Sequence, residues 1–261
     1  IKGKEEGFTA LGHLNPYLDE PRNQPFHDNN TQMLYNAERR IARVREAVGE
    51  DTDLCLELHR RLEPGLAVQL SARLEPYAPM FLEDPIRPDN FDEMARVAQQ
   101  CQIPIATGER INSLFEFEML LERGACSYVR ASIGVCGGFT GIKKIAALAE
   151  AHHKSLVPHN PLSPVTTNAL LQFCAATDNI AICEYPDPYA ASTADHLTGS
   201  GSKLRQVDMV TQIPKFEKGY VEIPEGPGLG IDLISDVEER FPFRPHAVGT
   251  RLNLDGSICD Q

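Results

Sequence analysis

Short apolar runs that each end in a carboxylate recur along the first half of the chain. Glu57, Glu83 and Glu109 stand 26 residues apart, and each follows an apolar stretch as long as a buried strand. A step of about 26 residues holds one strand, one helix and two short loops, the repeat of a parallel β/α barrel. Similar steps lead to three more polar residues that follow strand-like runs, Ser132, His159 and Glu184. The sequence therefore predicts an α/β fold whose parallel sheet curls into a barrel.

Amphipathic helices alternate with these strands. The predicted strands are residues 8–11, 54–58, 79–82, 103–107, 128–131, 155–158 and 180–183. The predicted helices, placed by apolar side chains at helical spacing, are residues 31–48, 63–74, 90–100, 113–123, 138–152 and 164–176. We expect a helix turn over residues 1–7, an irregular loop over 187–206, short strand pieces over 207–230 and a tail over the last 30 residues.

The strand count bears on domain organisation. Seven strands are predicted, and a closed barrel of this kind needs eight. A missing strand leaves two open sheet edges, so we expect the chain to begin partway through its domain. We divide the chain into a partial barrel domain, residues 1–206, and a C-terminal segment, residues 207–261, that packs against it.

The three glutamates predict a metal site. Parallel barrel strands direct their C-terminal ends to one face, so Glu57, Glu83 and Glu109 are expected to converge there. Carboxylates brought together repel one another, and burying them is costly unless a cation compensates. A hard divalent cation is the simplest compensation. The alternative is that each glutamate is a solvated, capping or loop residue, since Glu109, for example, precedes the basic residue Arg110.

Composition excludes several classes of partner. The 261 residues fit one barrel domain, and no apolar run approaches the 18 or so residues of a membrane span. The net charge of −12 argues against nucleic acid or an anionic membrane as a partner. It does not argue against an anionic substrate, because a bound cation can reverse the local field. The seven scattered cysteines favour a reducing, cytoplasmic location.

Five motifs in order resemble one family. They are Glu-Leu-His at 57–59, Phe-Leu-Glu-Asp-Pro at 81–85, Ala-Thr-Gly-Glu-Arg at 106–110, Gly-Gly at 137–138 and Val-Pro-His-Asn-Pro-Leu at 157–162. Together with Glu184 they resemble the enolase superfamily and, within it, the mandelate racemase subgroup, closest to galactonate- and gluconate-type sugar acid dehydratases. The resemblance implies a TIM-like modified (β/α)7β barrel that here lacks its first strand and its N-terminal capping domain.

The resemblance also implies roles for individual residues. Glu57, Glu83 and Glu109 would hold Mg²⁺, His159 would remove the α-proton of a sugar acid, and His59 would help the β-hydroxyl leave. Glu184 would hydrogen-bond the substrate carboxylate, with Arg110 and Ser132 also against the substrate. The product would be a 2-keto-3-deoxy sugar acid. The family also implies a homo-oligomer.

Three departures from the family pattern leave alternatives open. Glu57 stands where Asp is usual, and Ser132 stands where the catalytic His usually has an Asp partner, which predicts a weaker base at His159. The lysines that racemases and cycloisomerases carry on the second strand are absent, which fits galactonate-type dehydratases and disfavours a lysine-based racemase, and His13 is a possible substitute. A cycloisomerase or epimerase, and a non-catalytic homologue that only binds metal or ligand, are therefore the competing hypotheses. On its own, His159 could be a turn residue and His59 part of a solvated basic loop.

Overall fold

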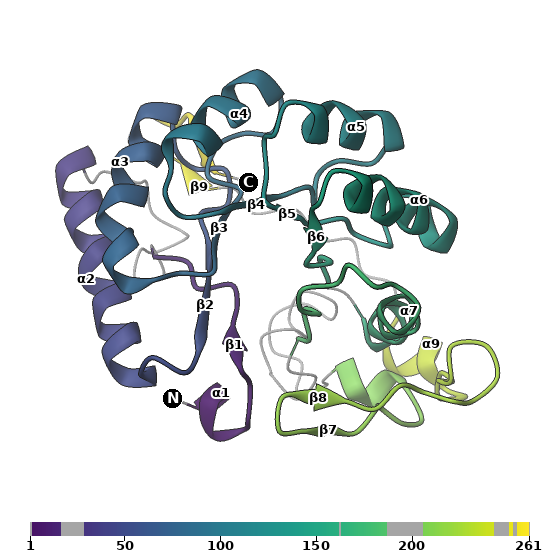
Figure 1. Ribbon diagram of the computed structural model, residues 1–261. Helices are drawn as coiled ribbons and strands as arrows, with labels where there is room; N and C mark the ends of the chain where they lie inside the picture. The colour runs from purple at the N-terminus through teal and green to yellow at the C-terminus, as the bar shows by residue number, and fades with distance from the viewer. Residues whose placement is uncertain are drawn as a thin grey trace.

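A curled parallel sheet forms the centre of the molecule (Figure 1). The computed structural model describes residues 2–16, 29–161, 163–186, 206–242, 251–252 and 255–260. Six strands pair in chain order. They are β1 (Ala10–Leu11), β2 (Asp53–Glu57), β3 (Phe81–Glu83), β4 (Ile105–Thr107), β5 (Tyr128–Val129) and β6 (Ser155–Leu156). Ile180 extends the sheet by a single parallel bridge to Leu156. The predicted α/β barrel-like fold is thus confirmed as a curled half-barrel.

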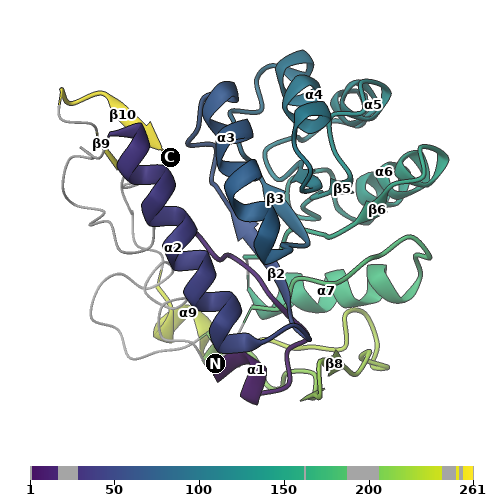
Figure 2. The ribbon, with the colours of Figure 1, turned by 60° about the vertical axis from the view of Figure 1, so that its left-hand side comes forward.

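Helices cover the outer, convex face of this sheet (Figures 1 and 2). They are α2 (Asn30–Val48), α3 (Pro64–Leu74), α4 (Phe91–Gln100), α5 (Leu114–Glu122), α6 (Gly138–Ala151) and α7 (Pro164–Ala175). Short 3₁₀ helices span Glu75–Tyr77 and Gln206–Met209. Within the described ranges, no helix combines the length and the apolar character that a membrane crossing requires.

Local sequence explains where these helices begin. Asn29 caps α2, Asn90 caps α4, and Ser113 forms a capping box with Glu116 at the start of α5. A proline opens α3 and another opens α7, where its missing N–H is not needed. The helix bounds therefore agree with the predicted ranges to within one residue, because caps and apolar spacing are both local signals.

The two faces of the sheet carry different side chains. Leu54, Leu56 and Leu82 point outward into the large apolar core beneath the helices. Cys55 and Phe81, on alternate positions, join Ala106 and Val157 in a second, smaller cluster on the concave side. Side chains along a strand alternate between faces. Glu57 and Glu83, two residues beyond Cys55 and Phe81, consequently point to the concave side.

Short elements occupy the two ends of the chain. The helix turn α1 (Lys2–Glu5) lies at the N-terminus, as predicted. In the C-terminal segment, β7 (Phe216–Glu217) pairs with β8 (Tyr220–Val221), in keeping with the strand pieces expected there. Most of the loop expected at 187–206 lies outside the described residues. The division of the chain at residue 206 remains a prediction.

Short elements occur in the tail expected at the end of the chain. The last 30 residues contain α9 (Val237–Arg240) and an antiparallel pair of β9 (Arg251–Leu252) with β10 (Ile258–Asp260). The side chain of Asp255 accepts hydrogen bonds from the N–H and the hydroxyl of Ser257, an Asx turn between the two strands. Such short elements have too few residues to show a period in the sequence.

Contacts across the open side of the half-barrel join its first and last strands. Phe8 stacks on Phe216 with ring centroids 4.4 Å apart, and Phe216 stacks on Tyr185 at 5.7 Å. His13, just after β1, pairs with Glu184 through Nε2 and Oε1. The two edges of the sheet are therefore linked by an aromatic stack and by an ion pair next to the concave face.

Candidate functional site

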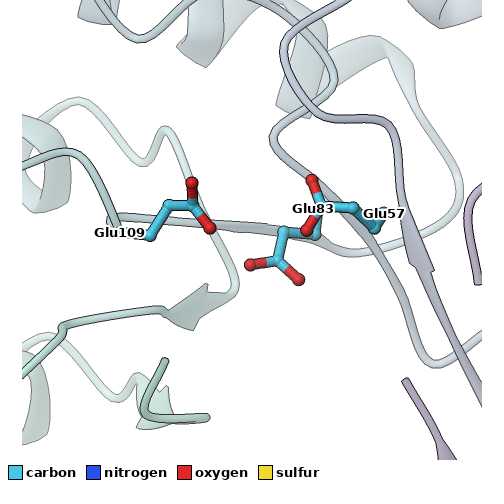
Figure 3. Close-up of side chains that lie close together, drawn as sticks. All are labelled: Glu57, Glu83 and Glu109. Carbon is cyan, nitrogen blue, oxygen red and sulfur yellow. The ribbon is translucent and has the colours of Figure 1, made fainter. Parts of the chain in front are cut away.

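The three predicted metal ligands come together on the concave side (Figure 3). Glu57 and Glu83 are register partners on β2 and β3, and Glu109 lies two residues beyond β4. One carboxylate oxygen from each lies within 4.8 Å of the other two. Glu57 and Glu83 are buried, and the Glu109 side chain is only 9% exposed. The convergence that strand spacing predicts is therefore present.

Each glutamate of the triad has donors around it. Glu57 accepts the N–H of His59 at 2.8 Å, and its other oxygen lies 3.6 Å from Nδ1 of His13. Arg130 donates through Nε to Glu83 at 2.5 Å. Glu109 accepts a hydrogen bond from Nη1 of Arg60 at 2.5 Å. Its other oxygen lies 3.0 Å from Nε2 of His159. The alternative that these are solvated surface carboxylates is excluded by their burial.

Burial and neighbouring charges change the pKa values of these carboxyl groups in opposite directions. Burial raises the pKa of Glu83 well above its usual range, although Arg130 acts in the opposite sense. Burial also raises the pKa of Asp84, to about 6, with repulsion from Glu109 adding to the effect. For Glu109 burial is outweighed by His159 and Arg60, which lower the pKa to about 2. The carboxylates thus differ in how well their negative charge is compensated.

The donor set suits a hard divalent cation. The three clustered ligand atoms are all carboxylate oxygens, and oxygen donors are the ones that Mg²⁺ and Mn²⁺ select over the nitrogen and sulfur that zinc prefers. The raised pKa of Glu83 records the free-energy cost of its buried negative charge, which a cation beside it would offset. The residues present therefore fit the metal that the family implies.

His159 faces the triad with one ring nitrogen and the interior with the other. Its backbone N–H donates to the carbonyl of Ala131 at 3.1 Å, which sets it beside the end of β5. Its Nδ1 is buried without a hydrogen-bond partner among the described residues, and so is Oγ of Ser132. Among the described residues, Ser132 therefore does not supply a hydrogen bond to His159.

His59 follows β2 in a left-handed conformation. Its φ is 52° and that of Arg60 is 64°, so the alternation of strand side chains does not continue past Leu58. The His59 ring is instead oriented by Arg60, whose Nη2 lies 2.9 Å from Nε2 of His59. Arg60 also donates to Asp84 at 3.0 Å, and Thr107 donates to the other oxygen of Asp84 at 2.6 Å. A buried arginine thus positions His59 and Glu109 together.

Glu184 is held by a different set of donors from those of Glu109. It accepts hydrogen bonds from Nη2 of Arg130 and from the N–H of Asn160, both at 2.7 Å, and from His13. Burial acts to raise its pKa, but Arg130 and His13 lower the pKa below the usual range. An ionised carboxylate accepts hydrogen bonds and donates none. In this state Glu184 cannot itself donate to a substrate carboxylate, and its contact with the substrate stays a prediction. The half-exposed ring of His13 uses Nε2 for Glu184, and its Nδ1 lies 3.6 Å from Glu57.

Arg110 stands at the rim of the site. Its Nε is 3.7 Å from Glu109 and its side chain is 50% exposed. It is the predicted substrate-contacting residue that solvent reaches most easily. A cation in this position can meet an anionic ligand without first breaking a buried ion pair.

Sequence reasoning missed the buried cations. Arg60 and Arg130 were given no role, and His13 was considered only as a substitute for a lysine. A signal for Arg130 was available, because a charged residue inside the apolar run 128–131 must be paired when that run is buried. For Arg60 no such signal exists, since its turn lies outside any periodic element.

Two proteins of known name are similar to this chain in sequence. Over 196 residues the chain is 36% identical to D-galactonate dehydratase of Ralstonia nicotianae, covering 74% of this chain and 49% of that protein. Over 225 residues it is 34% identical to D-galactonate dehydratase of Cronobacter sakazakii, covering 84% and 56% respectively. The chain therefore spans about half the length of these curated relatives.

Structural similarity extends over nearly the whole chain. An enolase from Agrobacterium radiobacter, named as a candidate galactarate dehydratase and bound to sodium and L-malate, superposes with a TM-score of 0.85. That structure is 28% identical, and the match covers 98% of this chain and 64% of the other. Residues 26–237 match the profile of the family described as enolase C-terminal domain-like. The resemblance found in the motifs is thus confirmed, and the chain belongs to the enolase C-terminal domain-like family.

Proposed function

We propose that this chain carries the catalytic barrel site of a Mg²⁺-dependent hydro-lyase that dehydrates an aldonate-type sugar acid. The observation that carries the proposal is the buried triad of Glu57, Glu83 and Glu109 with Nε2 of His159 3.0 Å from Glu109. Support for the substrate class comes from the two relatives named D-galactonate dehydratase. The L-malate in the structural neighbour is itself a 2-hydroxy acid, as aldonates are.

The triad and its neighbours would prepare the site for an anionic ligand. Glu57, Glu83 and Glu109 would hold Mg²⁺, which when bound supplies the positive charge that stabilises a carboxylate as its α-proton leaves. His13 would donate to the substrate carboxylate through Nδ1, while Glu184 holds the ring through Nε2. Arg110, at the rim, would contact the substrate from the solvent side.

Two histidines would move the protons. His159, in the tautomer that carries its hydrogen on Nδ1, would turn Nε2 from Glu109 to the substrate and take the α-proton there, which breaks the C2–H bond. The electron pair then forms the C2–C3 double bond as the C3 hydroxyl leaves. His59 would protonate that hydroxyl so that it departs as water. The resulting enol gains a proton at C3 and loses the proton of its C2 hydroxyl, which gives a 2-keto-3-deoxy acid, so that the net change is the loss of one water.

Ser132 limits the strength of the base in this proposal. A carboxylate beside Nδ1 of His159 would stabilise the imidazolium that forms on proton abstraction, and a hydroxyl stabilises it less. Nδ1 of His159 has no partner among the described residues. The same observation favours the second candidate, a homologue that binds metal and a sugar acid without turnover.

We further propose that the protein forms a homo-oligomer and is located in a reducing compartment.

Proton NMR in D₂O, with Mg²⁺ and a panel of aldonates and aldarates, tests the proposal. A dehydratase removes the α-proton signal of its substrate and produces a 3-deoxy methylene group. Exchange of the α-proton without a new methylene, and with a product isomeric with the substrate, indicates an epimerase or cycloisomerase. Absence of any exchange, from folded protein that binds Mg²⁺, indicates the non-catalytic homologue.

A further inference from the structure

Arg130 lies at the centre of the carboxylate site. It directly follows β5 and is 2% exposed. Nε donates to Glu83 at 2.5 Å and Nη2 donates to Glu184 at 2.7 Å, so one guanidinium bridges two carboxylates from distant parts of the chain. Nη1 donates to the carbonyl of Val157 at 2.9 Å. Contacts on three of its nitrogens fix the plane of the guanidinium.

The site holds more acidic groups than buried arginines. Five carboxyl groups gather there, Glu57, Glu83, Asp84, Glu109 and Glu184. Two buried arginines face them. Arg60 joins Asp84 to Glu109, and Arg130 joins Glu83 to Glu184. Arginine stays charged at any physiological pH, so these positive charges are permanent. Each arginine pairs one ligand of the proposed cation with a carboxyl group outside the triad.

We infer that Arg130 is a positioning residue that serves as a built-in counter-ion: it neutralises Glu83 and Glu184 so that the carboxylate cluster stays folded before any metal binds. This inference rests on the proposed function for its account of Mg²⁺ but not for its account of the fold. Removing one partner of a buried ion pair leaves an uncompensated charge. Loss of Arg130 should therefore make the fold depend on whether Glu83 is charged and on whether Mg²⁺ is present.

Thermal denaturation of the 261-residue chain in EDTA tests the counter-ion role directly. Arg130→Met should lower Tm by about 10 °C, and adding Glu83→Gln should recover at least half of that loss because the unpaired charge is removed. Arg130→Lys keeps the charge and should lose less than half as much as Arg130→Met. If Arg130→Met does not fold, Tm is measured for Arg130→Lys instead. Equal losses of Tm in Arg130→Met and Arg130→Lys would overturn the inference. So would a Tm that does not recover when Glu83→Gln is added to Arg130→Met.

Arg45 supplies a matched control. Its guanidinium donates to the carbonyls of Gly49, Thr52 and Tyr77, away from the carboxylate cluster. Arg45→Met should lower Tm by removing structural hydrogen bonds, and Glu83→Gln should give no recovery in that background. Recovery of similar size in both backgrounds would mean that Glu83→Gln is stabilising for reasons unrelated to Arg130, and the inference would fail.

Calorimetric titration with Mg²⁺ separates the counter-ion role of Arg130 from a purely structural role. Loss of a purely structural arginine would not make Mg²⁺ bind more tightly. Arg130→Met should bind Mg²⁺ about tenfold more tightly than the unaltered chain, since a competing positive charge beside Glu83 has gone. Weaker binding in the variant would overturn the counter-ion role. If the unaltered chain binds no Mg²⁺, the proposed function fails instead, and the recovery measured in EDTA still decides the role of Arg130.

Discussion

Glu57 and Glu83 are paired residues at the same level of two adjoining parallel strands. Neighbouring strands lie about 4.8 Å apart, so this pairing alone brings the two carboxylates within reach of one ion. Glu109 completes the group from the loop after β4. The geometry of the site is therefore a property of the sheet register, and changing one glutamate should affect cation binding without altering the strands.

The first prediction concerns the central ligand. Glu83→Gln should weaken Mg²⁺ binding by about a hundredfold or more and abolish sugar acid dehydration, because an amide oxygen carries no negative charge. Calorimetry and the NMR assay measure the two effects. Glu63→Gln, at a side chain that is 70% exposed and pairs with Arg87, is the matched control and should change neither. Full dehydratase activity in Glu83→Gln would contradict the metal role.

The second prediction separates the two histidines. His159→Asn should reduce α-proton exchange in D₂O by a factor of about 10² to 10⁴, since the base is lost. His59→Asn should slow elimination while leaving exchange of the α-proton measurable, because the acid acts on the leaving hydroxyl. Both rates come from the same NMR experiment. An equal loss of exchange in both variants would be inconsistent with the assigned roles.

The third prediction concerns the missing carboxylate partner of the base. Ser132→Asp should increase the rate of α-proton exchange at least tenfold, because the family pattern has an aspartate there as the partner of the catalytic histidine, and an anion next to an imidazole stabilises the imidazolium. Ser132→Asn, similar in size but uncharged, is the control and should give no such increase. No gain from the aspartate, with folding and Mg²⁺ binding intact, would favour the homologue that only binds ligand.

The fourth prediction concerns alkaline pH. The hydrogen bonds of His13 to Glu184 and Glu57 raise its pKa to about 11 from an ordinary value of 6.5. Because the folded-state pKa is the higher one, this stabilisation is complete below pH 6.5 and disappears as the pH rises towards 11. His13→Gln should therefore lower Tm at pH 6 more than at pH 10. An equal Tm difference at both values would show that His13 is neutral in the folded protein.

Much of this fold could be predicted from the sequence because its signals are local. Apolar runs at a regular step gave the strands, and caps such as Ser113 gave the helix starts. The step also identified Glu57, Glu83 and Glu109 as a group, since in a parallel barrel equal spacing places residues at the same end of neighbouring strands.

The surroundings of the triad could not be predicted in the same way. The pairing of Arg60 with His59 depends on two consecutive left-handed residues, which no periodic pattern indicates. The contact of Arg130 with both Glu83 and Glu184 depends on side-chain reach across the sheet. Spacing identified which carboxylates meet, but not which cations lie between them.

The pairing of His13 with Glu184 has a consequence for how the protein folds. The two residues are 171 positions apart in the chain, so forming their contact closes a very long loop. The entropy cost of closing such a loop delays its formation relative to contacts between neighbouring strands. During refolding we expect Glu57 and Glu83 to come together first, and the anion-binding side of the site to form only when the last strand arrives. Stopped-flow refolding should then show Mg²⁺-dependent signals before ligand-dependent ones.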